Sequence, residues 1–112
     1  MFNNFSKLIF CTLLLLLGLN ASAQNIKLDS QTNVHSCKSI VVYNNSRQHI
    51  RGGQIHWKYV FADGSESYGE TPMMGGAPSG SNSSPLMTYD AYAMSKCPTT
   101  RYQFQVVNSR FW

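Results

Sequence analysis

The sequence predicts an all-β fold: a small antiparallel β-sandwich or barrel of five to seven short strands, stapled by one disulfide. The first observation behind this prediction is a strict alternation of apolar and polar residues over 53–61. The second is composition, since Leu28 and Leu86 are the only leucines after residue 23, while Tyr, Ser, Val, Ile and Asn are common. The third is that turn residues separate several short strand signals, and no segment keeps a helical period for more than two turns.

Two strand candidates precede the strongest one. Residues 25–29 are a weak candidate, whereas residues 39–45 are a good one, because residues 40–43 are apolar on both faces and predict a central strand. The strongest candidate is 53–61. Its alternation places on one face Ile55, Trp57, Tyr59 and Phe61, and on the other face Gln54, His56, Lys58 and Val60.

The residues 62–64 (Ala-Asp-Gly) predict a hairpin, and two glutamates decide its form. A two-residue loop would place Glu66 and Glu70 on the apolar face, where a carboxylate is costly. A three-residue loop shifts the register by one and gives the glycine the left-handed position of a bulge. Both glutamates then lie on the polar face, near Val60 and His56. We therefore expect the three-residue loop.

Two candidates remain for the last part of the chain. Residues 87–94 are a weak strand candidate. Residues 101–107 alternate clearly, and we expect the inward-facing side chains to be Tyr102, Phe104 and Val106, with Gln103 and Gln105 facing outward.

The N-terminal segment is expected to lie outside the fold. A short positively charged start precedes the apolar run 8–19, and Ala21 and Ala23 are small residues at the positions that a signal peptidase accepts. We expect a secretory signal peptide over 1–23 and a single β-domain over 24–112, in a secreted or periplasmic protein. The apolar run is shorter than the roughly 20 residues of a membrane anchor, so we expect no membrane span after cleavage.

Two cysteines, Cys37 and Cys97, follow the predicted signal peptide. An exported chain usually meets an oxidising compartment, and neither cysteine has a CxxC neighbour of the kind that metal or redox pairs use. We expect a structural disulfide, worth about 4 kcal/mol by the loop-entropy estimate.

The order Cys37, Trp57, Cys97 resembles that of immunoglobulin domains, in which a buried Trp packs against the disulfide. Two features depart from that pattern. Tyr92 lies five residues before Cys97 rather than two, and Pro98 would interrupt a central strand. The order favours an immunoglobulin-like arrangement without assigning the chain to the family.

Residues 71–87 fit no strand or helix period, although they hold three of the eight glycines, three of the four prolines and three of the five methionines. Connections longer than about 12–15 residues are usually functional or disordered. Residues 79–84 have a linker composition, whereas Met73 and Met74 stand between a proline and two glycines. Two roles are open for this pair: capping an end of the sandwich, which we favour, or contacting a partner.

The sequence carries no motif of a known catalytic site. His56 and Glu70 become neighbours in the expected register, where an exposed ion pair is the ordinary outcome, so we expect no enzyme and no cofactor. The net charge of +4 is scattered rather than clustered, so we expect no nucleic-acid partner. Four methionines could supply thioether ligands for copper(I), although their spacing is not diagnostic of a copper site: Met73, Met74, Met87 and Met94.

We expect a small exported binding domain that recognises a protein or glycan in the cell envelope or extracellular space, as inhibitors, immunity proteins and adhesins do. The candidate contacts are Met73, Met74, Met87, Tyr89, Tyr92 and Trp112. The alternative is a structural subunit that assembles with copies of itself through an unpaired edge strand. The glutamates of the strand 65–70 argue against self-assembly through that strand. The strand 101–107 has no obvious charge that would prevent pairing with another copy. A periplasmic copper-binding protein is the third hypothesis.

Overall fold

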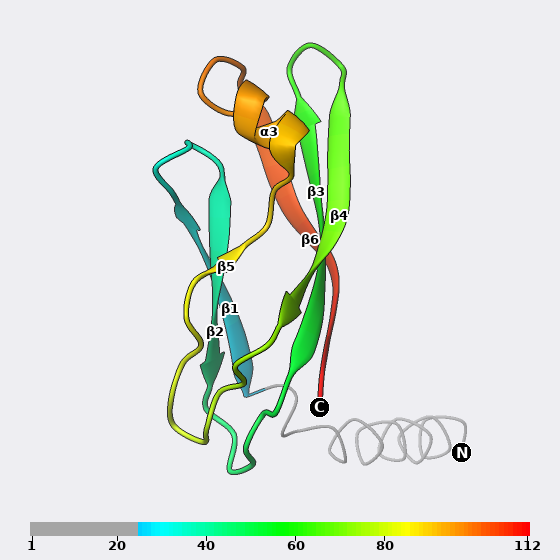
Figure 1. Ribbon diagram of the computed structural model, residues 1–112. Coiled ribbons are helices and arrows are strands. Elements are labelled where there is room, and N and C mark those ends of the chain that lie inside the picture. Colours follow the sequence, from blue (N-terminus) through cyan, green and yellow to red (C-terminus); the bar gives the residue numbers. More distant parts are fainter. Residues whose placement is uncertain (1–24) are drawn as a thin grey trace, which may run out of the picture.

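The computed structural model describes residues 25–112, and the predicted signal peptide 1–23 lies outside them. The elements follow in the order β1 (Ile26–Thr32), β2 (Lys38–Asn44), β3 (Gly53–Phe61), β4 (Glu66–Met73), β5 (Leu86–Met87), α3 (Ala91–Lys96) and β6 (Tyr102–Phe111). The strands form two antiparallel three-stranded sheets, β1-β2-β5 and β4-β3-β6, which face each other (Figure 1). The expected small β-sandwich with one disulfide is confirmed. No helix in 25–112 is long and apolar enough to cross a membrane.

Strand β2 is the centre of the first sheet. It pairs with β1 over its whole length, and its other edge pairs with β5 at Ser39↔Met87 and Ile40↔Leu86. Residues 39–42 are buried on both faces. The apolar run therefore predicted the central strand correctly, and the weak candidate at 25–29 is the start of β1.

Strand β3 is the centre of the second sheet, between β4 and β6. The alternation is confirmed, since the buried side chains are Ile55, Trp57, Tyr59 and Phe61. The three-residue hairpin loop is confirmed as well. The Phe61 N–H donates to the Ser65 carbonyl at 2.9 Å, and Gly64 has a φ of 88°. Glu66 and Glu70 pair with Val60 and His56 as expected.

Strand β6 pairs with β3 and is otherwise an edge strand among the described residues. Its register shifts beside Trp57, which leaves Val107 as the extra residue of a β-bulge. The predicted faces are confirmed over the first half of the strand: Tyr102, Phe104 and Val106 are half-buried, and the two glutamines are exposed.

The strand expected over 87–94 is wrong beyond Met87, because residues 91–96 form the helix α3. Asp90 caps this helix, and its carboxylate accepts hydrogen bonds from the Ala93 N–H and the Ser67 hydroxyl, both at 2.8 Å. A good capping residue and two alanines favour a helix over the strand preference of the tyrosines.

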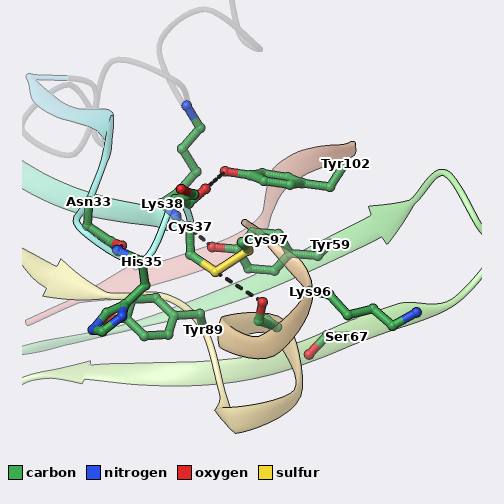
Figure 2. The surroundings of a disulfide bond; sticks show 12 residues. Asn33, His35, Cys37, Lys38, Tyr59, Ser67, Tyr89, Lys96, Cys97 and Tyr102 are labelled. Atoms are coloured by element: carbon green, nitrogen blue, oxygen red, sulfur yellow. Dashed lines mark hydrogen bonds between the residues drawn. A yellow bond between two sulfur atoms is a disulfide. The ribbon is translucent and has the colours of Figure 1, made fainter. Parts of the chain in front are cut away.

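The core divides into two clusters along the sandwich. The cluster at the disulfide end contains Cys37, Trp57, Tyr59, Phe61, Ala93 and Cys97. The second cluster contains Ile40, Val42, Ile50, Ile55, Met73 and Ala77. Phe104 packs against both clusters. As predicted, Cys37 and Cys97 form a disulfide, which ties the β1–β2 turn to the end of α3 (Figure 2).

Candidate functional site

The connection between β4 and β5, residues 74–85, packs back onto the sandwich at the end opposite α3 (Figure 1). Ile50 and Ala77 exchange two backbone hydrogen bonds, of 3.0 and 2.8 Å, and Ala77 is fully buried. Gly76 has a φ of 68°, and a β-carbon there would lie 2.5 Å from the Ile50 carbonyl oxygen. These contacts support the capping role for most of this connection.

Asn44 holds the cap in place. Its side chain is fully buried, and its amide group donates to the carbonyls of Gln48 at 2.7 Å and Ala77 at 2.8 Å. Its side-chain oxygen accepts from both the N–H and the hydroxyl of Ser46. Its backbone N–H donates to the Ser81 carbonyl at 2.9 Å. One residue therefore joins β2 to two loops.

Met73 and Met74, adjacent in the sequence, have opposite environments. Met73 is 2% exposed and belongs to the second core cluster, so its side chain stabilises the fold and presents no surface to a partner. Met74 is 85% exposed. Trp112 is half-exposed near the same end, where its indole lies beside Gly52 and the Arg110 guanidinium lies 5.4 Å from its ring.

The other candidate contacts lie elsewhere. The Tyr89 hydroxyl donates to the Met87 sulfur at 3.2 Å, and its ring packs edge-on against His35 with centroids 5.9 Å apart (Figure 2). Tyr92 lies on α3 and packs against the Phe61 ring. The candidate contacts are therefore spread over both ends of the molecule and do not form one patch.

The methionines considered as copper ligands also lie in separate elements. Met73 ends β4, Met74 follows it, Met87 lies in β5 and Met94 lies in α3. Over residues 25–112, no three His, Cys, Asp or Glu side chains are grouped as metal ligands.

An open hollow lies on the outer face of the β4-β3-β6 sheet. It has a volume of about 540 Å³ and is lined by His56, Trp57, Lys58, Glu66, Tyr68, Gly69, Glu70 and Val107. Tyr68 lies opposite Lys58 across the β4–β3 pair and is 73% exposed. The bulge directs Val107 to the same surface, where it is 56% exposed. An exposed tyrosine and an exposed valine thus stand among charged groups.

Two close side-chain pairs lie in this hollow. His56 Nε2 lies 3.4 Å from Glu70 Oε2, and Lys58 Nζ lies 3.4 Å from Glu66 Oε1. The four side chains are 35 to 54% exposed. Exposed pairs add little stability, but they place hydrogen-bonding groups on either side of Tyr68. The bulged hairpin positions these groups, because it brings both glutamates to the outer face.

The sequence predicted half of this hollow. Alternation and the hairpin register placed His56, Lys58 and both glutamates on one face. Tyr68 was not chosen as a contact, although the same register places it on the polar face between those glutamates. Val107 was missed, because a β-bulge has no sequence signature here.

A second group of charges lies at the β3–β4 turn. Lys96 of α3 donates to the Asp63 carboxylate, and this contact holds the pKa of Asp63 well below its usual range and raises the pKa of Lys96. The Lys96 ammonium also lies 5.4 Å from the Tyr92 ring. These contacts fasten α3 to the hairpin.

Comparisons with protein-family models, with curated proteins and with solved structures find no match to this chain.

Proposed function

We propose that the protein is an exported, non-enzymatic binding domain that recognises a protein or glycan partner through the outer face of its β4-β3-β6 sheet. The hollow around Tyr68 carries this proposal. Export is the proposed context because the predicted signal peptide and the Cys37–Cys97 disulfide both fit an oxidising compartment.

Tyr68 has the properties of a recognition residue. Tyrosine is enriched among the residues that dominate binding energies, because it offers a large rigid ring and a polar hydroxyl at a low entropy cost. Its side chain is 73% exposed on β4. The neighbouring side chains of His56, Lys58 and the two glutamates offer donors and acceptors, and a ligand site commonly combines apolar surface with a few placed polar groups.

The environment of His56 and Glu70 supports binding rather than catalysis. Both side chains are about half exposed, and they lie 3.4 Å apart on a sheet face. General acids and bases are usually tuned by burial in a cleft. These two groups have the setting of a solvated surface pair.

The proposal is tested with immobilised, oxidised chain 24–112 and extracts of the source cells' envelope and medium. Tyr68→Ala is compared with Met74→Ala, which removes another exposed large side chain, outside the hollow. We expect Tyr68→Ala to weaken the retained partner's affinity at least tenfold, the effect of losing about 1.4 kcal/mol. Met74→Ala should bind as the unaltered chain does.

The same experiment identifies the partner class. Protease treatment of the extract should abolish capture of a protein partner, and periodate oxidation should abolish capture of a glycan. Loss of binding with Met74→Ala, and not with Tyr68→Ala, would move the site to the loop. Equal binding by both variants would reject the sheet face.

A further inference from the structure

The free edge of β6 is less protected than the other outer edge of the same sheet. That other edge is β4, which carries Glu66 and Glu70 and has Pro72 near its end. Charges and prolines of this kind keep a strand edge from pairing with another chain. Residues 102–107 of β6 carry neither a charge nor a proline. Within residues 25–112, no strand pairs with this edge.

The hydrogen-bonding groups available at this edge follow from the β3–β6 ladder. The Ala62 N–H donates to the Arg101 carbonyl at 2.8 Å, in line with the strand register. Residues that bond to the neighbouring strand alternate along an antiparallel ladder, so Gln103 and Gln105 direct their backbone groups toward β3. The free edge therefore presents the N–H and C=O groups of Tyr102, Phe104 and Val106.

We propose that two copies of this chain pair through these free edges, antiparallel, about a twofold axis that passes beside Phe104. In this register Phe104 lies opposite the partner's Phe104, and Tyr102 lies opposite the partner's Val106. Each of these pairs exchanges two backbone hydrogen bonds, about six in total. The two β4-β3-β6 sheets become one continuous six-stranded sheet.

The side chains of β6 are self-complementary in this register. On the inner face, half-buried apolar residues meet half-buried apolar residues. On the outer face, Gln103 lies opposite the partner's Gln105, and two amides can exchange hydrogen bonds. No like charges lie opposite each other between residues 102 and 106. A second copy of the chain therefore satisfies both faces of the edge.

Pairing would also change how the sheet face is presented. The twofold axis is perpendicular to the continuous sheet, so the outer faces of both copies point in the same direction. If the proposed recognition through Tyr68 holds, a dimer carries two such hollows side by side and can bind a repetitive partner with gain in avidity. Pairing itself does not depend on that recognition.

The test is a measurement of mass against concentration by sedimentation velocity, with the oxidised chain 24–112. We expect the mass to double as concentration rises. Gln103→Lys/Gln105→Lys places the introduced lysines opposite each other at both contacts between position 103 of one copy and position 105 of the other. This variant should therefore stay monomeric. Mixing the double-lysine variant with Gln103→Glu/Gln105→Glu should restore the doubled mass, because opposite charges then lie opposite each other at both of these contacts.

Ser30→Lys/Gln31→Lys is the matched control, since it adds the same charges to exposed positions of β1, which is the edge of the other sheet. It should dimerise as the unaltered chain does. Amide hydrogen exchange supplies a reading that needs no variant: Tyr102, Phe104 and Val106 should exchange more slowly at high concentration than at low. A mass that stays monomeric at all concentrations, or dimers that persist in the double-lysine variant, would overturn the proposal.

Discussion

At the scale of single residues, Asn44 joins more of the structure than its size suggests. Asn44→Ala removes four side-chain hydrogen bonds and leaves the carbonyls of Gln48 and Ala77 without these donors. We expect the free energy of unfolding to fall by about 2–4 kcal/mol, because unsatisfied buried polar groups are costly. Urea unfolding measures the change. Asn45→Ala, at an exposed neighbouring position, is the control and should change stability by less than about 0.5 kcal/mol. Equal effects would contradict the role of Asn44.

The buried Tyr59 should make the free energy of unfolding fall as the pH rises into the alkaline range. Burial raises its pKa to about 12, against a usual value near 10. The unfolded chain therefore releases this proton first, so the stabilisation is complete below about pH 10 and is lost as pH rises toward 12. The loss can reach about 2–3 kcal/mol. Tyr59→Phe should unfold with a shallower dependence on pH between 10 and 12, measured by urea unfolding at a series of pH values. An unchanged slope would assign the alkaline loss to other tyrosines.

At the scale of elements, the helix α3 depends on its cap. Asp90→Ala removes the acceptor for the Ala93 N–H and for the Ser67 hydroxyl. We expect a loss of about 1–2 kcal/mol in the free energy of unfolding, because an N-cap is worth about 1 kcal/mol and the bond to β4 adds to it. Asp90→Asn keeps an acceptor oxygen and should lose clearly less. Thermal unfolding of the two variants distinguishes a capping effect from a charge effect, which would lower both equally.

The β3–β4 hairpin and α3 show which elements a sequence can predict. The β3–β4 hairpin was predicted in register because Glu66 and Glu70 are costly on an apolar face, and only one loop length avoids that. The helix was missed because Tyr89 and Tyr92 suggest a strand, while the capping Asp90 acts through a contact with Ser67 that is distant in sequence. Met73 was misassigned for a related reason: local composition does not show that a methionine between Pro72 and Met74 points into the core.

At the scale of the whole molecule, one covalent bond ties the β1–β2 turn to the end of α3, at one end of the sandwich. Reduction of the Cys37–Cys97 bond, which spans 60 residues of chain, should lower the free energy of unfolding by about 4 kcal/mol. Small domains have little stability to spare, so the reduced protein should melt at a much lower temperature. Calorimetry with and without reductant measures this. Cys37→Ala/Cys97→Ala is the control. Its melting temperature should be as low as that of the reduced protein and should not change when reductant is added. A reduced protein as stable as the oxidised one would contradict this account.

The placement of β6 has a consequence for the time course of folding. Residues 62–101 separate β3 from its partner β6, so the central strand of the second sheet stays paired on one side only until those residues have been synthesised and have returned. Phe104, which fills part of both core clusters, arrives with β6. Sheets built from such distant pairings fold slowly. A nascent chain of this protein therefore cannot complete its second sheet, or close either core cluster with Phe104, until the last strand has been synthesised.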